Sequence, residues 1–234
     1  MERRNTIGIV GKLTAPPELI VDAAEWERKV YETKLKRVRP SGREDTFILR
    51  FDGQAAGSKE EFQKFGEGMD VMVGGEIRSE NVPNPKPEES RVKVFIYAEA
   101  VVVNDPPAKD QNEARICGYL CKPPHFRPAR SGFEIDVRTA ATSVLVAVNS
   151  RSGASYIPCV CFGWMAVHAD RLKVGDYIEV YGRFQSRQHK KKIEGRKLPY
   201  LRTVYEVCAF KIKRKGKEDR GEKRGKERGI SENA

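Results

Sequence analysis

Residues 7–17 read Ile-Gly-Ile-Val-Gly-Lys-Leu-Thr-Ala-Pro-Pro, and a related stretch, Ala-Arg-Ile-Cys-Gly-Tyr-Leu-Cys-Lys-Pro-Pro, occupies residues 114–124. Both alternate apolar or small residues with other residues, and both stop at a Pro-Pro pair. Such alternation predicts a half-buried strand, and the prolines predict the turn that ends it. The two stretches share an isoleucine, a glycine, a leucine and the proline pair at an offset of 107 positions, which indicates an internal duplication.

A second pair of segments supports the duplication at the same offset. Residues 68–79 and 175–186 both begin with glycine, continue through alternating apolar residues and end with serine. The halves are separated by a polar, proline-bearing segment, and the chain ends in Lys, Arg, Glu, Asp and Gly without an apolar period. We therefore predict domains at residues 1–104 and 112–213, a linker at 105–111 and a disordered, basic C-terminal tail at 214–234.

Each half has the same predicted order of elements. In the first half, residues 30–38 and 46–51 form a hairpin, Ser58 and Glu61 begin a short helix as a capping box, and two strands follow. The second half repeats this order. Five strands with one helix between the third and the fourth is the order of an OB-fold. The predicted fold class is all-β, with two tandem OB-folds, each a five-stranded Greek-key barrel.

The charge of the chain restricts its partners. Lys and Arg number 44 against 33 Asp and Glu, giving a net charge of +11, which favours nucleic acid or an anionic membrane surface. No apolar run approaches the roughly 20 residues that a membrane-spanning helix needs, and the first residues lead into no signal-peptide core. We expect a cytoplasmic protein without a membrane partner.

Neither metal binding nor catalysis is expected. Cys117, Cys121, His125, Cys159 and Cys161 raise the question of zinc, but their spacing fits a zinc ribbon poorly and suits small apolar residues in strands. The odd number of five cysteines also argues against a disulfide framework. The sequence has no Gly-rich phosphate loop, no nucleophile elbow and only three His. We predict no cofactor, no metal and no enzymatic activity.

The second half resembles the bacterial and phage single-stranded DNA-binding proteins. The resemblance rests on the order and spacing of four segments, residues 118–124, 144–149, 156–163 and 172–184. The first half is similar only at residues 11–17 and 68–79, as a diverged copy would be. The resemblance implies sequence-nonspecific binding and protection of single-stranded DNA in replication, recombination or repair, and a nucleoid-associated location.

The resemblance also bears on assembly and partners. Members of this family usually carry one OB-fold per chain and form tetramers, so two folds per chain imply a homodimer with four OB-folds. Members commonly end in an acidic tail with a hydrophobic tip that recruits replication or recombination proteins. This chain ends Lys-Glu-Arg-Gly-Ile-Ser-Glu-Asn-Ala, so we do not expect recruitment by that route. The basic tail either adds phosphate affinity or is simply solvated.

Single strands are held by rings that stack on bases and by cations that neutralise phosphates. The resemblance places stacking rings at Tyr156, Phe162 and His189, the last where the family commonly has Trp. Tyr156 and Phe162 are six residues apart on one strand and so share a face, although a core position for Phe162 stays open. For Trp164 we favour packing or an oligomer contact. In the first half the nearest equivalents are Tyr31, Phe47 and Phe51, for which a core role is equally compatible.

Basic residues accompany the predicted rings in both halves. The first hairpin supplies Lys34, Lys36, Arg37 and Arg39, and the last loop of the second half supplies Arg187, Lys190, Lys191, Lys192, Arg196 and Lys197. In an OB-fold that loop borders the binding groove, although a solvated hairpin without a ligand remains an alternative. Two other functions stay open: an OB-fold protein-interaction module of a primosome or recombination complex, and single-stranded RNA binding.

Overall fold

The structure, a computed structural model, describes residues 5–86, 90–104, 110–131, 134–150, 153–191 and 199–216. Most of the predicted linker and tail lies outside these ranges. Within them, no helix has the length and apolar character needed to cross a membrane.

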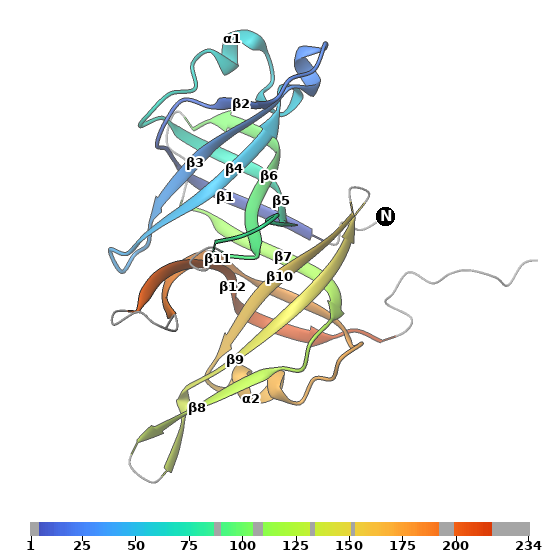
Figure 1. Cartoon of the computed structure of the whole chain (residues 1–234). Helices are drawn as coiled ribbons and strands as arrows, with labels where there is room; N and C mark the ends of the chain where they lie inside the picture. Colours follow the sequence, from blue (N-terminus) through green and yellow to red (C-terminus); the bar gives the residue numbers. More distant parts are fainter. Residues whose placement is uncertain are drawn as a thin grey trace, which may run out of the picture.

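The first half folds into a closed barrel that precedes the second along the chain (Figure 1). Its elements are β1 (Asn5–Leu13), β2 (Glu18–Val21), η1 (Trp26–Arg28), β3 (Val30–Val38), β4 (Glu44–Asp52), η2 (Gln54–Ala56), α1 (Lys59–Phe62), β5 (Asp70–Asn81) and β6 (Val92–Val103). The barrel circuit is β1-β3-β4-β6-β5, with β4 parallel to β6 and β1 closing onto β3. The predicted capping box of α1 is confirmed, since the Ser58 and Glu61 side chains each accept a hydrogen bond from the other's backbone N–H.

The second half repeats the circuit. Its elements are β7 (Asn112–Leu120), β8 (His125–Ser131), β9 (Glu134–Ser150), β10 (Gly153–Phe162), α2 (Trp164–Asp170), β11 (Tyr177–Lys191) and β12 (Tyr200–Arg214). Strand β10 runs parallel to β12, and β7 closes onto β9. The prediction of an all-β chain with two OB-folds is confirmed. The edge strands β2 and β8 were not predicted; each follows one of the two Pro-Pro pairs.

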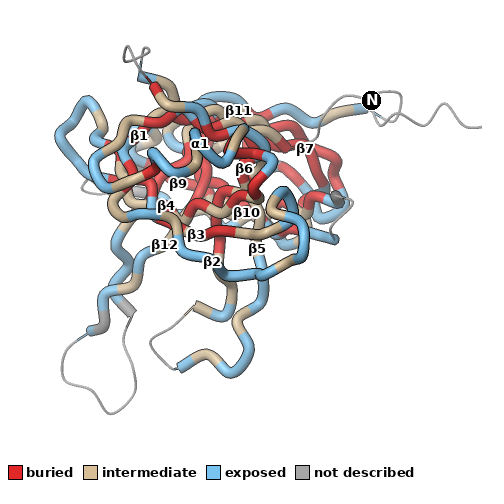
Figure 2. Tube along the Cα trace, turned by 90° about the horizontal axis from the view of Figure 1, so that it is seen from above, coloured by how far each residue is buried: buried red, intermediate tan, exposed pale blue. Residues whose placement is uncertain are grey.

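Burial follows the period of two that strands impose. Alternate residues of β1, β3 and β4 are buried, and β10 follows the same pattern except at Val160, which is buried between Cys159 and Cys161. The main apolar core is one contiguous cluster that extends through both halves. Figure 2 shows the buried segments gathered in the middle of the molecule and the exposed ones in the outlying loops.

The halves join through an antiparallel pairing of β1 with β7. Ile7 lies opposite Ala114, flanked by the pairs Asn5 with Ile116 and Ile9 with Asn112. The repeat offset of 107 exchanges the two flanking pairs and converts the central pair into itself, so the pairing has approximate two-fold symmetry. A continuous antiparallel sheet in the order β6-β5-β1-β7-β11-β12 results.

Two asparagines beside this junction make equivalent contacts, each within its own half. Asn112 donates from Nδ2 to the Phe184 carbonyl oxygen at 2.8 Å and accepts from the Phe184 N–H at 2.9 Å. Asn5 makes the same pair of bonds to Ile77, at 2.6 and 3.1 Å. Both side chains are buried, and each amide pairs with one backbone N–H and one backbone C=O of its own half.

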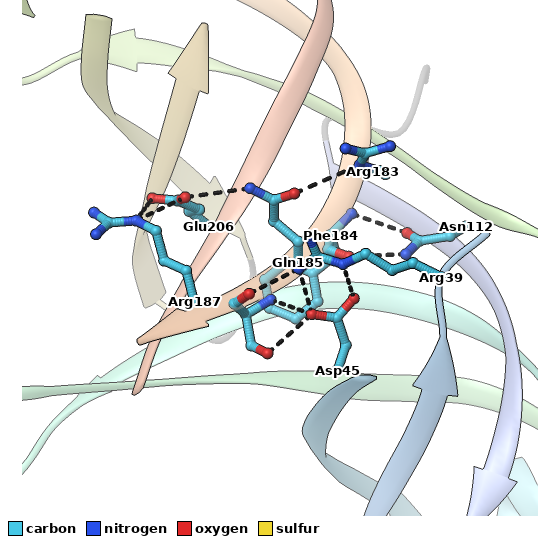
Figure 3. A network of polar contacts seen from close by, with 9 residues as sticks. Arg39, Asp45, Asn112, Arg183, Phe184, Gln185, Arg187 and Glu206 are labelled. Carbon is cyan, nitrogen blue, oxygen red and sulfur yellow. Dashed lines mark hydrogen bonds and ion pairs between the residues drawn. The ribbon is translucent and has the colours of Figure 1, made fainter. Parts of the chain in front are cut away.

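A second set of contacts fixes the angle between the halves. The Phe47 ring of β4 stacks on the Phe184 ring of β11, with centroids 4.8 Å apart. Beside it, Arg39 forms two hydrogen bonds of 2.6 Å with Asp45 and a third, of 2.7 Å, with the Ser186 carbonyl oxygen (Figure 3). Burial alone would raise the pKa of Asp45, but the hydrogen bonds from Arg39 and Ser186 outweigh it and lower that pKa. Asp45 is therefore a buried anion shared by both halves.

We predict that Asn112→Ala lowers the free energy of unfolding by about 1–3 kcal/mol, because a buried N–H and C=O of Phe184 lose their partner. Urea denaturation measures the change. The control is Asn149→Ala, at an exposed position of β9. Equal stabilities of the two variants would show that the Asn112 amide does not stabilise the contact of β7 with β11.

Candidate nucleic-acid interface

The outer face of the second barrel carries two exposed rings on β10. Tyr156 is 46% exposed and Phe162 is 49% exposed, while Ile157, Cys159 and Cys161 between them point inward. The structure thus places both predicted rings on one open face and excludes the core position for Phe162. Trp164, the first residue of α2, is 77% exposed, so packing within the described part of the chain does not cover it.

This side of the sheet continues across β12 and β11. Val160 of β10 lies opposite Cys208, which in turn lies opposite Arg183. Val160 and Cys208 are buried, in a small cluster with Ala141. Phe210, 57% exposed, sits at the β-bulge next to Gly182, with the Arg183 guanidinium 6.0 Å from its ring centre. Sequence patterning had not singled out Phe210 or Arg183, because the bulge breaks the period of two that assigns faces.

The predicted rings of the first half are in the core. Phe47 and Phe51 are fully buried and Tyr31 is 8% exposed, so the prediction that they stack on bases is wrong. Their neighbours are other core rings: Tyr31 and Phe51 lie beside each other, with centroids 6.1 Å apart.

The reason lies in the register of β4. Gly75 and Gly182 are equivalent in the repeat and lie opposite Ala98 and Ala209 at matching bulges. Counting back one residue makes Tyr97 equivalent to Cys208, and the parallel pairings then make Arg50 equivalent to Val160. On this register Thr46 and Asp52 occupy the places of Tyr156 and Phe162. Because successive side chains alternate between faces, rings at the odd positions of β4 point inward.

The outer face of the first barrel is closed by its own charges. Arg50 pairs with Glu32 at 2.6 Å and with Glu80 at 2.8 and 2.9 Å, and its guanidinium lies 4.3 Å from the ring centre of Phe95. Lys93 adds a second cation to Glu32 at 3.0 Å. Burial alone would raise the pKa of Glu32, but hydrogen bonds from the two cations lower it. The charges of this face are therefore paired with one another, and the Arg50 guanidinium covers the Phe95 ring, so a base could not stack there.

The basic residues of the first hairpin have mixed roles. Lys34 is exposed, and Lys36 pairs with Glu44 at 2.7 Å. Arg37 is 8% exposed and pairs with Asp110 at 2.7 Å, and Arg39 is engaged with Asp45. Arg37 and Arg39 therefore fasten parts of the chain together, which corrects the prediction that they bind phosphate.

Predicted cations of the second half lie on the β11–β12 arm, which is the part of this strand pair that begins at Arg187 and Val204. His189 and Lys190 are exposed, whereas Arg187 donates from Nε to both carboxylate oxygens of Glu206, at 2.9 and 3.0 Å (Figure 3). The side chain of Lys191 and all of Lys192, Arg196 and Lys197 lie outside the described residues. Their predicted phosphate contacts stay predictions.

A groove of about 990 Å³ runs between the halves. Tyr156 forms part of its wall, together with Tyr205 and Pro158 of the second half. Next to Tyr156 the halves are joined by its N–H, which donates to Ser79 Oγ at 2.7 Å. The groove depends on how the two halves are placed, so the pattern of either half alone could not have revealed it.

The cysteines considered for zinc lie in strands or beside them. Cys159 and Cys161 are buried in β10, and burial raises the pKa of Cys161 to about 12, which opposes the thiolate that a metal needs. Among the residues that the structure describes, no group of three or more His, Cys, Asp or Glu side chains is arranged to hold a metal ion.

These features define a tandem OB-fold protein with an exposed aromatic face on one barrel. No protein-family model and no curated protein sequence matches the chain. Among solved structures, it is similar to the wild-type single-stranded DNA-binding protein from Thermus aquaticus, with a TM-score of 0.68, 20% sequence identity and coverage of 98% of this chain and 96% of that chain. A deletion mutant of the Thermus aquaticus protein gives a TM-score of 0.65, 19% identity and coverage of 90% and 94%. At these identities the likeness establishes the tandem OB-fold itself, which the repeat and the order of elements in the sequence had predicted.

We predict that two phenylalanine substitutions differ strongly in their effect on stability. Phe51→Ala empties a core site and lowers the free energy of unfolding by about 3–5 kcal/mol, whereas Phe162→Ala on the open face changes it by less than about 0.5 kcal/mol. Urea denaturation of both variants checks this. A large decrease in stability for Phe162→Ala would place that ring in the core.

Proposed function

We propose that this protein binds and protects single-stranded DNA without reading its sequence and without catalysis. The observation that carries the proposal is the pair of half-exposed rings, Tyr156 and Phe162, on one face of the second OB-fold. Stacking on aromatic rings tolerates any base, since every base has a π-face. The similar Thermus aquaticus structure is that of a single-stranded DNA-binding protein, which supports the same assignment.

Phosphate neutralisation supplies the second part of the proposed mechanism. His189 and Lys190 are exposed on β11 of the same barrel, and the chain has a net charge of +11. Cations that displace counterions from a single strand make affinity fall with rising salt, by about 0.7 in logarithmic slope for each phosphate. We expect a steep salt dependence of binding.

The biological setting belongs to the proposal as well. Binding of unpaired DNA places the protein in replication, recombination or repair, in the cytoplasm on nucleoid DNA. Contacts with proteins of those pathways would use a surface other than an acidic C-terminal tip. Base stacking does not separate DNA from RNA, so binding tests include both.

We predict that Tyr156→Ala and Phe162→Ala each weaken binding to single-stranded DNA by about 1–3 kcal/mol, because each removes one stacking platform. Fluorescence anisotropy with labelled single-stranded DNA, single-stranded RNA and duplex measures the affinities. Tyr119→Ala is the control, because its ring is 36% exposed but lies against Tyr177 on a different strand pair. Duplex bound as tightly as single strands would contradict the proposal.

We further propose a homodimer that brings four OB-folds together through the outer face of the β6-β5-β1-β7-β11-β12 sheet. In the first half, Val10, Met72 and Val102 lie side by side on three strands of this face. Met72 is 39% exposed and Val102 is 51% exposed. An open apolar row of this kind favours contact with another protein surface.

The matching row of the second half is charged. Glu179, equivalent to Met72, has a side chain only 3% exposed and contacts Arg115 and Lys215. Burial alone would raise the pKa of Glu179, but hydrogen bonds from Tyr181, Arg115 and Lys215 outweigh it and lower that pKa to about 2. This carboxylate is already satisfied, so we assign the dimer contact to the apolar half of the face.

We predict that Met72→Glu converts the dimer into a monomer, because the new carboxylate would be desolvated in the interface. Light scattering at micromolar concentration measures the mass of both proteins. A monomeric wild-type protein under these conditions would overturn the homodimer and leave the DNA-binding proposal standing.

A further inference from the structure

The groove between the halves contains groups that the proposed ring face does not use. Its lining includes five cationic side chains and no acidic one among the residues that the structure describes. The cations are Lys86, Arg91 and Lys93 from the first half and Lys122 and Arg202 from the second. Of these, Lys93 is already paired with Glu32, while Arg91 and Lys122 are exposed at the rim.

Arg202 supplies an independent sign of a ligand. Its Nε is buried and has no hydrogen-bond partner within the described part of the chain. A buried guanidinium nitrogen without an acceptor is costly, and an anionic oxygen is its best partner. Arg202 lies opposite His189 on the β11–β12 arm, next to the cations of the proposed DNA path.

The interior of the groove has a different character from its rim. Its lining includes Ile48 and Val94 of the first half and Leu145, Pro158 and Val204 of the second, all less exposed than Arg91 and Lys122. The Tyr205 ring also lines it and lies 6.2 Å from the ring centre of Phe184. An apolar floor below a cationic rim suits a polymer with flat bases and regularly spaced anions.

Tyr156 connects the two surfaces. It belongs both to the exposed face of β10 and to the groove wall. A strand stacked on Phe162 and Tyr156 therefore has a continuous route from the outer face of the second barrel into the groove. The first barrel offers no matching ring face among its described residues, because Arg50 covers Phe95 and the Arg78 guanidinium lies 3.8 Å from the ring centre of Tyr97.

We propose that single-stranded DNA runs from the ring face of the second half into the groove, where the first half contributes phosphate contacts but no stacking ring. This inference rests on the proposed function. It gives the two OB-folds different tasks: the second stacks bases and also contacts phosphates, whereas the first contacts phosphates only. The contacts of Phe47 and Arg39 with the second half hold the groove walls in place before DNA arrives, which limits the cost of ordering them on binding.

The test uses the full-length double variant Arg91→Gln/Lys122→Gln. We expect it to weaken binding of a long oligothymidine at least fivefold and to reduce the logarithmic salt slope by about 1.4, or 0.7 for each phosphate that the variant no longer neutralises. Binding of an oligothymidine of about four nucleotides, near the lower limit for one OB-fold, should change less than twofold. The matched control is Lys64→Gln/Lys173→Gln, which removes two exposed lysines that are not part of the groove lining.

The outcomes separate this inference from the proposed function. If Tyr156→Ala weakens binding but the groove variant keeps the salt slope of the control variant, the groove inference is overturned and the ring face stands. If the wild-type protein binds no single strand, both fall. A third variant, Tyr97→Ala, removes a ring from the first barrel's outer face and should leave affinity within twofold. A decrease in affinity equal to that of Tyr156→Ala would overturn the division of tasks.

Discussion

The antiparallel pairing of β1 with β7 is the constraint on which the rest of the molecule depends. It places two copies of one barrel about an approximate two-fold axis at Ile7 and Ala114. Beside the junction, the buried amides of Asn5 and Asn112 tie β1 to β5 and β7 to β11, so each half holds its own junction strand in place. The groove and the six-stranded sheet face both follow from this one junction.

Duplication supplied two equivalent scaffolds, and side chains then made them different. On the outer face of β10 the chain has Tyr156 and Phe162, where β4 has Thr46 and Asp52. The first barrel fills the corresponding surface with paired charges such as Arg50 with Glu80. An ion pair that satisfies itself has little to gain from a phosphate, whereas an exposed ring keeps its stacking face available. The asymmetry therefore concentrates the proposed base contacts on one barrel.

Much of the fold could be predicted from the sequence, because duplicated strands and the capping box at Ser58 are local patterns. The faces of the strands could not be assigned with the same success. Alternation divides residues into two sets without saying which set is inside, so Tyr156 was placed correctly and Phe47 was not. The parallel pairing of β4 with β6 decides the matter, and it joins strands that are distant along the chain, as in the pair Leu49 and Ile96. The groove depends on still longer-range contacts between the halves.

Photocrosslinking of the protein to single-stranded DNA, followed by mass spectrometry of the adducts, tests the central claim most directly. Stacked rings sit in van der Waals contact with bases, so the account predicts adducts at Tyr156 and Phe162 and none at Phe47 or Phe51. Adducts confined to the first barrel, or to the outer face of the six-stranded sheet, would contradict it.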